Sequence, residues 1–143
     1  MLNIINMDLT KVESGIIVHQ LNNKGVMGAG FAKQIRAKYP QHYGDYLRAR
    51  KELGDVVITR VRSDLFIIGY IGQDGYGRDG KCYTRYSALI KAFKAIQNFS
   101  DSHNLPVYCP YNMGCGLAGG DWSIVSHFIE LFMPYNTTIA KYN

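Results

Sequence analysis

The sequence has few cysteines, and they are not arranged for a disulfide or a zinc site. Cys82, Cys109 and Cys115 are an odd set with no CxxC spacing, so the chain has neither a disulfide framework nor a zinc signature. It also lacks an HExxH motif and clustered carboxylates, which would indicate a catalytic metal. We therefore expect reduced thiols, no metal and no resident cofactor.

Long apolar runs and a secretory leader are missing as well. No segment is apolar over the roughly 20 residues that a membrane-spanning helix needs. The first residues contain no basic stretch followed by an apolar one, which would mark a signal peptide. These absences predict a soluble, cytoplasmic protein that has no membrane partner.

Charge of one sign is never concentrated in this sequence. Lysine and arginine outnumber the acidic residues to give a net charge of +5, but no long run of basic residues occurs. A basic tail that binds nucleic acid is therefore disfavoured. The net charge suits an anionic ligand such as a nucleotide, a nucleic acid or a charged protein, and a solvated surface explains it equally well.

The chain does have enough length and apolar content for one folded domain. Its 143 residues are 47% apolar, which argues against disorder and suffices to bury a core without disulfides. No linker, repeat or low-complexity tract divides the sequence. We expect a single domain, residues 1–143, that acts as a monomer.

Two glycine-rich stretches are the most informative feature of the sequence. The first glycine loop, residues 22–31, reads Asn-Asn-Lys-Gly-Val-Met-Gly-Ala-Gly-Phe, and the second, residues 112–121, reads Asn-Met-Gly-Cys-Gly-Leu-Ala-Gly-Gly-Asp. Each loop follows an apolar run and precedes a helical pattern. Because glycine has no side chain, backbone N–H groups there can approach an anion closely, and a helix N-terminus adds free donors. Two such loops are able to hold a diphosphate from both sides.

The better-known phosphate-binding motifs do not fit the first glycine loop. Gly25 and Gly30 have P-loop spacing, but Phe31 and Ala32 stand where Lys and Ser or Thr are required. Gly28 and Gly30 match the start of a dinucleotide fingerprint, but a lysine replaces its third glycine and no acidic residue follows at the right distance. An unspecialised strand–glycine–helix anion site remains, with tight packing of helix on strand as the alternative.

The hydrophobic pattern predicts the order of the elements. Short apolar or β-branched runs predict strands, and apolar residues recurring every three or four positions predict helices. Ser63-Asp64 predicts a hairpin turn, and the glycine density of residues 72–80 predicts a mobile loop. Helices that alternate with apolar strands predict a three-layer α/β/α fold with a mixed, mostly parallel sheet. The expected strands are residues 2–6, 15–21, 56–62, 65–71, 106–110 and 137–142, and the expected helices are residues 31–39, 42–53 (with Gly54 as its cap), 84–100 and 122–133.

Several polar residues near these loops have both a structural and a functional interpretation. His19 lies within an apolar strand and is either a core histidine or a catalyst. Asp74 and Asp121 are either a turn residue and a helix cap, or catalytic acids. Asp8 follows the first strand, at the edge where α/β folds bind ligands. Cys115 is either a small loop residue or a nucleophile near helix dipoles.

The same stretches of sequence resemble a macrodomain, the ADP-ribose-binding module. The resemblance is to the branch that contains the human terminal ADP-ribose protein glycohydrolase and the yeast ADP-ribose 1″-phosphate phosphatase, and to its phage and bacterial members. The combination of Met-Gly-Ala-Gly with Gly-Cys-Gly-Leu is the more specific part. The resemblance spans nearly the whole chain and rests on residues 6–10, 18–22, 27–32, 72–77 and 113–122.

The resemblance implies a role for each matching position. Asp8 corresponds to the acid that accepts a hydrogen bond from the adenine amino group, and Tyr142 is a candidate platform for the adenine ring. The first glycine loop corresponds to the segment that wraps the distal ribose and diphosphate, and the second to a further phosphate loop. The implied substrate-binding residues are Asp8, Leu9, Gly28, Ala29, Gly30, Phe31, Gln73, Asn112, Gly114, Cys115, Gly116, Leu117 and Tyr142.

Two departures separate this chain from the glycohydrolases of that branch. Those enzymes use a lysine after the strand corresponding to Leu65–Ile71, whereas residues 72–74 of this chain contain no lysine. They also use an aspartate directly after Gly-Cys-Gly-Leu, where this chain has Ala118. The phosphatases have a histidine in the second strand and an acid in the middle loop, which His19 and Asp74 match.

The resemblance therefore implies hydrolysis of ADP-ribose 1″-phosphate to ADP-ribose and phosphate, with His19 or Asp74 orienting or deprotonating water. Three alternatives stay open. In the first alternative, the chain removes ADP-ribose from modified protein or nucleic acid, with Asp121 acting without a lysine. In the second, it binds ADP-ribose as a reader without turnover. In the third, it is an unrelated α/β nucleotide binder that prefers ATP or NAD.

Overall fold

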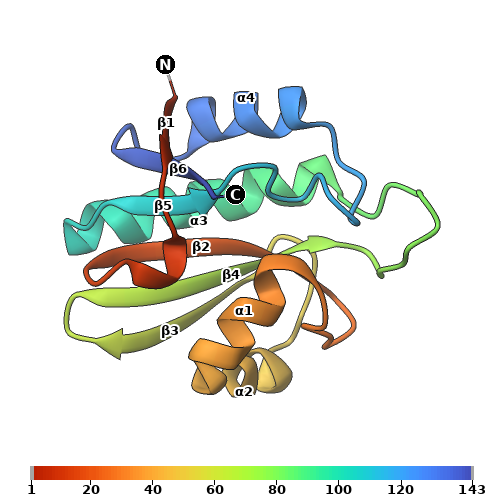
Figure 1. The fold of residues 1–143 in the computed structure, drawn as a ribbon, viewed down its shortest axis with the longest axis horizontal. Helices are drawn as coiled ribbons and strands as arrows, with labels where there is room; N and C mark the ends of the chain where they lie inside the picture. Colours follow the sequence, from red (N-terminus) through yellow and green to blue (C-terminus); the bar gives the residue numbers. More distant parts are fainter. Residues whose placement is uncertain (1, 143) are drawn as a thin grey trace.

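Two neighbouring strands inside the sheet are buried nearly throughout, and they determine its layering. In the computed structural model, which describes residues 2–142, all eight residues of β2 (Gly15–Asn22) are buried. The same holds for every residue of β4 (Leu65–Gln73) except the last. A strand that is buried on both faces needs cover on both sides. The helices accordingly lie on both sides of the sheet (Figure 1).

The remaining elements follow the predicted order, and one short element was not predicted. This is a 3-10 helix, η1 (Leu9–Lys11), directly after the first strand. The other strands are β1 (Asn3–Asn6), β3 (Val56–Arg62), β5 (Val107–Pro110) and β6 (Thr137–Lys141). The helices are α1 (Gly30–Lys38), α2 (Pro40–Arg48), α3 (Tyr86–His103) and α4 (Trp122–Phe132).

The strands form one mixed sheet in the order β1-β6-β5-β2-β4-β3. Neighbouring strands are parallel throughout, apart from β3 and β4, which run antiparallel on either side of the Ser63-Asp64 turn. The predicted hairpin and the predicted mixed, mostly parallel sheet are both confirmed.

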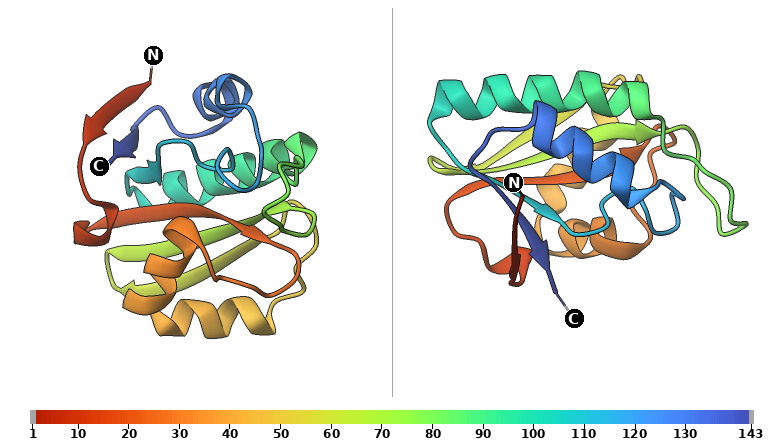
Figure 2. Two further views of the ribbon diagram at one scale, coloured as in Figure 1. Left: turned by 45° about the vertical axis from the view of Figure 1, so that its right-hand side comes forward. Right: turned by 90° about the horizontal axis from the view of Figure 1, so that it is seen from above.

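Side chains alternate along β2, so this strand contributes to two separate cores. Ile16 and Val18 pack with residues of α3 and α4, whereas Ile17 and Leu21 pack with residues of α1 and α2. Figure 2 shows the two helix pairs on opposite sides of the sheet. The predicted three-layer α/β/α fold is confirmed. The same alternation turns His19 towards the α1–α2 layer.

The second helix differs from its prediction. α2 spans Pro40–Arg48 instead of residues 42–53, and Ala49 is its C-cap, so the prediction of Gly54 as the cap is wrong. Proline fits the first turn because its fixed φ suits a helix and its missing N–H has no partner there in any case. Gly54 instead lies in the turn before β3, where its N–H donates to a carbonyl of β4 at 2.8 Å.

The sheet opens at its centre, between β2 and β5. These strands are paired only at Ile16–Val107 and Ile17–Tyr108, whereas β5 continues beside β6 as far as Pro110. The carboxyl halves of β2 and β5 therefore diverge. Because β2 leads to β4 on one side and β5 lies on the other, the strand order reverses at this point. Open α/β sheets bind ligands at such a switch point.

Candidate functional site

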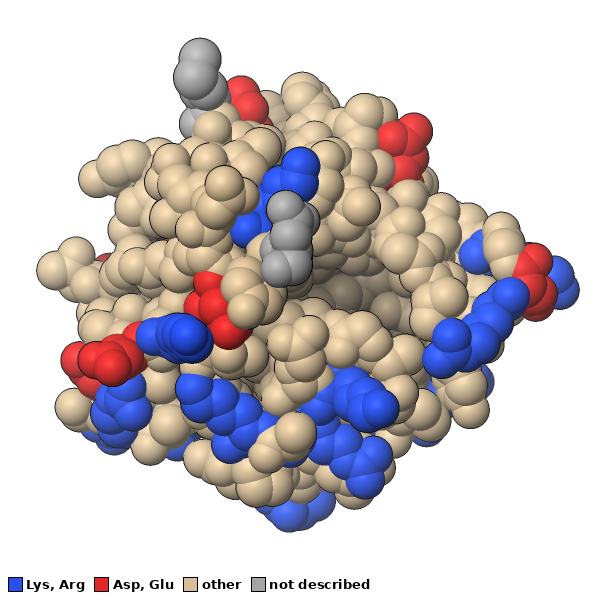
Figure 3. Space-filling view, viewed as in Figure 1, with Lys and Arg blue, Asp and Glu red and all other residues tan. Residues whose placement is uncertain are grey.

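A cleft of about 560 Å³ lies over this opening, and both glycine loops line it. Figure 3 shows a hollow in this face of the molecule. The carboxyl half of β2 and the loop after β4 complete the walls. The two loops are far apart in the sequence but contribute to one site. The sequence-predicted residues that line the cleft are His19, Gly28, Ala29, Gly30, Phe31, Gln73, Asn112, Gly114, Gly116 and Leu117.

Asn22 and Tyr46 hold the first glycine loop in place. Asn22 accepts the N–H of Lys24 at 2.9 Å through Oδ1 and donates from Nδ2 to the carbonyl of Val26 at 2.8 Å. The buried Tyr46 hydroxyl donates to Asn22 Oδ1 at 2.8 Å and accepts the N–H of Gly25 at 3.0 Å. Burial raises the pKa of Tyr46 to about 12, so the hydroxyl keeps its proton. A side chain of α2 thus fixes the loop that precedes α1.

Helix α1 begins at the cleft without a side-chain cap. Its N-cap is Ala29, whose methyl group cannot accept a hydrogen bond. Within residues 2–142, the backbone N–H groups of Gly28, Ala29 and Gly30 have no acceptor. The start of α1 therefore offers unpaired donors and the positive end of a helix dipole to an anion in the cleft.

The second glycine loop is built from tight turns that need glycine. Gly114 has a φ of 77°, and a Cβ there would lie 2.7 Å from Gln20 Oε1, so a residue with a side chain would be strained and would displace Gln20. The carbonyl of Gly114 accepts the Thr84 hydroxyl at 2.7 Å, which ties the loop to the segment before α3. In the described part of the chain, the N–H groups of Gly116 and Leu117 have no acceptor. They give the cleft a second set of donors.

A second hollow, of about 390 Å³, adjoins the cleft. It contains five residues that the resemblance assigns to the ligand, namely Asp8, Leu9, Phe31, Asn112 and Tyr142. The two spaces are adjacent because they share part of their lining, and together they form what we call the joined cleft. The residues common to both are Phe31, Pro110, Tyr111 and Asn112.

The Asp8 side chain is prepared to accept a hydrogen bond. Its Oδ1 accepts the backbone N–H of Thr10 at 2.9 Å and the Thr10 hydroxyl at 2.7 Å. The hydroxyl bond, followed by the backbone bond, lowers the pKa of this carboxyl. The Asp8 carboxyl is therefore ionised at neutral pH, and its second oxygen can accept a donor such as an exocyclic amino group.

His19 belongs to the cleft wall but is almost completely buried, with 1% of its surface exposed. Its Nε2 lies 2.8 Å from Nε2 of His42 on α2, and the edge of Phe31 packs against its ring at 6.2 Å between centroids. Burial lowers the pKa of His19 well below its ordinary value. The ring is thus neutral at physiological pH, and one of its two nitrogens can accept a hydrogen bond.

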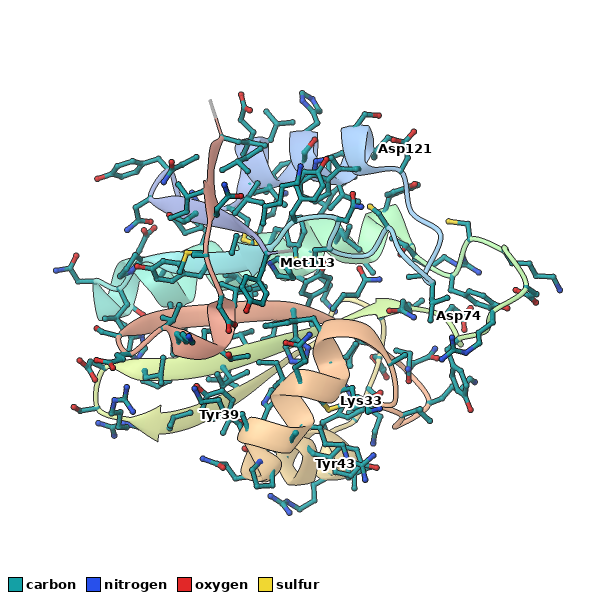
Figure 4. All side chains as sticks on the ribbon, in the orientation of Figure 1. Lys33, Tyr39, Tyr43, Asp74, Met113 and Asp121 are labelled. Atoms are coloured by element: carbon teal, nitrogen blue, oxygen red, sulfur yellow. The ribbon has the colours of Figure 1, made fainter. Side chains whose placement is uncertain are left out.

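The two acidic candidates lie outside the lining of the cleft. Asp74 is exposed, and its Oδ1 accepts the Nδ2 group of Asn23 at 3.1 Å. Asp121 is the exposed N-cap of α4, where its Oδ1 accepts the N–H of Ser123 at 2.9 Å. Figure 4 shows Asp121 at the start of α4, apart from both Asp74 and Met113. The helix-cap interpretation of Asp121 is confirmed.

Cys115 is poorly suited to act as a nucleophile. Its Sγ donates to the carbonyl of Met113 at 3.4 Å, and burial raises the pKa of its thiol to about 11. A thiol with such a pKa stays protonated at neutral pH and reacts slowly. The geometry favours the interpretation of Cys115 as a small residue within the loop.

Four lining residues with useful chemistry were missed from the sequence. Tyr76 and Arg78 come from the loop after β4, Gln20 comes from β2, and Tyr111 directly follows β5. The position of Tyr111 after a strand was an available signal, because ligands of α/β folds gather at carboxyl ends. Arg78 had no signal beyond the glycine density around it.

Metal sites, disulfides and membrane helices do not add to this picture for residues 2–142. No group of three or more His, Cys, Asp and Glu side chains there is arranged to hold a metal ion. The cysteines of this part are free. None of its helices has the length and apolar character that crossing a membrane requires.

Solved structures match the chain over nearly its whole length, although no protein-family model and no curated protein sequence matches it. A protein from Bacteroides thetaiotaomicron is 27% identical, with a TM-score of 0.86 and 99% of both chains covered. A macrodomain protein from Streptomyces coelicolor is 24% identical, with a TM-score of 0.79, and covers 100% of this chain and 99% of its own. This chain has the macrodomain fold.

Other structures of similar fold include nucleotide complexes. The macrodomain of Oceanobacillus iheyensis, solved with ADP, is 18% identical with a TM-score of 0.66, and the match covers 98% of this chain and 82% of that one. Thermosipho africanus DarTG, solved with ADP-ribose, is 16% identical with a TM-score of 0.69. The match covers 90% of this chain and 38% of that one. At these identities the likeness concerns the macrodomain fold alone.

Proposed function

We propose that the chain binds ADP-ribose in the joined cleft and hydrolyses ADP-ribose 1″-phosphate to ADP-ribose and phosphate. The observation that carries this proposal is the pair of glycine loops, which bring two sets of unpaired backbone donors to one cleft. A diphosphate presents several acceptor oxygens at once, and such donors match them. The similar structures solved with ADP and with ADP-ribose support this choice of ligand.

The lining residues suggest how the nucleotide is oriented. The adenine ring occupies the smaller hollow, where Asp8 accepts its amino group and Tyr142 flanks the ring. The diphosphate lies between the start of α1 and the second glycine loop. Arg78 adds a positive charge to the same cleft. The distal ribose and its 1″-phosphate then reach the end of the cleft that His19 borders.

Hydrolysis requires an attacking water and stabilisation of charge on the phosphoryl oxygens. The water oxygen bonds to phosphorus, and the bond from phosphorus to the 1″ oxygen breaks. The 1″ oxygen takes up the proton that the water gives up. Unpaired N–H groups of the loops stabilise the developing charge, and neutral His19 orients or deprotonates the water. We favour His19 over Asp74 because His19 borders the cleft, whereas Asp74 is exposed and bonded to Asn23.

Calorimetry and phosphate release test this function. ADP-ribose should bind more tightly than ATP or NAD, and the 1″-phosphate should be released with turnover. We expect His19→Gln to slow phosphate release by about 100-fold with little change in the Kd of ADP-ribose, while Asp74→Ala changes neither. If Asp74→Ala lowers turnover alone, then Asp74 and not His19 acts on the water. Preference for ATP or NAD would contradict the assignment of the cleft.

Removal of ADP-ribose from modified protein or nucleic acid is the second candidate function. Figure 3 shows Lys and Arg side chains gathered below the hollow, over α1 and α2, and such a charged border favours a polyanion. A panel of substrates carrying ADP-ribose on glutamate, serine, DNA or thymidine separates this function from the phosphatase. A reader would bind ADP-ribose tightly and release product from none of them.

A further inference from the structure

A chain of hydrogen-bonded side chains leads from the wall of the cleft to the surface. His19 Nε2 on β2 lies 2.8 Å from His42 Nε2 on α2, and His42 Nδ1 lies 2.8 Å from Thr59 Oγ1 on β3. The Thr59 hydroxyl lies 2.6 Å from Oδ2 of Asp45 on α2. At the outer end, Arg48 donates to Asp45 Oδ1 at 2.7 Å. Three separate elements are thus joined by polar groups, although His19, His42 and Thr59 are buried.

The acidic end of this chain fixes the direction of every hydrogen bond in it. The Asp45 carboxylate can only accept, so the Thr59 hydroxyl donates to it. Thr59 has no second proton, so it accepts from His42, whose proton is therefore on Nδ1. A neutral His42 then has a bare Nε2, which accepts from His19. The proton of His19 is consequently on Nε2, and its Nδ1 carries a lone pair.

Both imidazole rings are neutral, as this sequence of bonds requires. Burial lowers the pKa of His19 well below its ordinary value, and the neighbouring His42 lowers it further. Burial lowers the pKa of His42 to about 4, although the nearby Asp45 carboxylate opposes that shift. Each hydrogen bond between these side chains therefore contains a single proton at physiological pH.

The inner end of this chain of hydrogen bonds is His19 Nδ1, an acceptor without a partner. Among residues 2–142, nothing donates to His19 Nδ1, although the atom is buried. A buried acceptor left unpaired costs free energy, so such atoms in folded proteins are normally paired with a protein group, a water or a ligand. His19 borders the cleft, so a group bound in the cleft is the nearest source of such a partner outside the protein.

We propose that His42, Thr59 and Asp45 are positioning residues, which hold His19 as the tautomer whose bare Nδ1 accepts a hydrogen bond from an O–H group in the cleft. The O–H group belongs either to the attacking water or to the distal ribose, and this identity rests on the proposed function. The tautomer itself follows from the hydrogen bonds and does not depend on that function.

The packing around His19 makes room for this arrangement. Gly69 of β4 is the lateral neighbour of His19 in the sheet. A Cβ at Gly69 would lie 3.1 Å from His19 Nε2 and 2.3 Å from a methyl carbon of Leu21. Glycine at this position therefore lets the imidazole ring approach the sheet closely enough to reach His42.

The proposed tautomer also explains how the cleft discriminates between the parts of its ligand. A bare lone pair repels the oxygens of an ionised phosphate, which are acceptors as well, and attracts a hydroxyl proton. The glycine loops have the opposite preference because they offer N–H groups. The diphosphate is directed to the loops, and at the His19 end an O–H group rather than a phosphoryl oxygen faces Nδ1, which orients the ligand along the cleft.

Nitrogen NMR of the histidine-labelled protein tests the tautomer directly. In the free protein at neutral pH, His19 should carry its proton on Nε2 and His42 on Nδ1. A His19 that carries its proton on Nδ1 would overturn the proposal without any variant. Because this spectrum needs no ligand, its result stands even if ADP-ribose does not bind.

Variants of Thr59 separate positioning from simple core packing. Thr59→Val removes the hydroxyl at nearly constant shape, so His42 loses the acceptor for its Nδ1 proton. We expect His42 to carry its proton on Nε2 instead, which forces His19 to carry its own on Nδ1. Phosphate release should then fall on the order of 10-fold in kcat with little change in KM. Thr59→Ser, the matched control, should restore the tautomer and the rate.

An unchanged His19 tautomer in a folded Thr59→Val protein would overturn the positioning role. If that variant does not fold, Asp45→Ala provides the same test from the outer end of the hydrogen-bonded chain, because it removes the acceptor of the Thr59 hydroxyl. Titrations with ADP-ribose and with ADP identify the hydroxyl. A ribose hydroxyl shifts the His19 Nδ1 signal with ADP-ribose only, because ADP lacks the distal ribose, whereas a bound water gives the same response to both ligands.

Discussion

Tyr46 shows how one residue on α2 controls a loop that belongs to the site. Its hydroxyl joins Asn22 and Gly25 and so bridges the two ends of the turn that precedes α1. The ring is buried beneath that turn. The donors at the start of α1 are therefore kept in position by a contact that involves no part of the ligand.

We expect Tyr46→Phe to weaken ADP-ribose binding and to destabilise the protein. The change leaves Asn22 and Gly25 without their common partner, and a lost hydrogen bond of this kind costs about 1–2 kcal/mol of unfolding free energy. Binding should weaken severalfold because the loop is less well ordered. Calorimetry and urea unfolding measure both effects.

Tyr43→Phe is the matched control for this prediction. Tyr43 lies on the same helix, and its ring supports the Arg36 guanidinium at 3.9 Å, a contact that phenylalanine retains. Figure 4 shows both α2 and the labelled Tyr43 side chain. Equal ADP-ribose affinity in the Tyr46 and Tyr43 variants would show that the hydroxyl does not order the loop.

Single residues were predictable from the sequence where their environment is local. Asp121 at the start of an apolar helix pattern predicted a cap, and the cap is present. The hydrogen bonds that run from His19 through His42 to Thr59 were not predictable. They join β2 to α2 and β3, and no short spacing in the sequence records which buried polar groups will meet in space.

Elements were predicted well where apolar patterns are long, and poorly where a helix ends. β2 and β4 were found because they are buried along their length. The end of α2 was misplaced because Leu53 continued the apolar spacing beyond Ala49, where the helix ends. Asn104 ends α3 with a φ of 51°. Asparagine tolerates this left-handed conformation, but its presence in the sequence does not by itself predict the end of a helix.

Helix α4 offers a test that distinguishes stability from catalysis. Asp121→Ala removes the acceptor for the Ser123 N–H, so the midpoint of urea unfolding should fall. ADP-ribose affinity and phosphate release should stay at their original values, because Asp121 does not line the cleft. Asp121→Asn keeps a good cap and removes the carboxylate. A stable Asn variant that has lost turnover would make Asp121 catalytic after all.

Stability of the whole molecule should depend on pH through its buried histidine pair. The pKa of His42 is about 4 in the folded protein, compared with about 6.5 in an unfolded chain. Between these values the unfolded state binds a proton that the folded state excludes, so stability is complete above pH 6.5 and falls as the pH drops towards 4. His19 contributes in the same direction.

We expect the free energy of unfolding at pH 5 to be about 2 kcal/mol lower than at pH 7.5 from His42 alone. Urea unfolding at the two pH values measures the difference. His42→Gln should reduce it, since this variant has no imidazole to protonate at that position. Equal unfolding free energies at both pH values in the unaltered protein would contradict the neutral, buried pair.

The meeting of the two glycine loops was predictable at the scale of the whole molecule, but the shape of the cleft was not. Both loops follow parallel strands, and the carboxyl ends of parallel strands share one edge of the sheet. The divergence of β2 from β5 after Ile17 and Tyr108 creates the opening. That divergence depends on how far each strand pairs, which the sequence does not reveal.

The burial of β2 also determines which parts of the molecule can move when a nucleotide comes and goes. This strand is buried along its whole length, and its first half is paired on both sides, so the amides of that half should exchange in heavy water only when the entire protein unfolds. The glycine loops have few partners for their amides and exchange early. Ligand binding and release therefore require only the glycine loops to move, while β2, which bears His19, stays in place with the core.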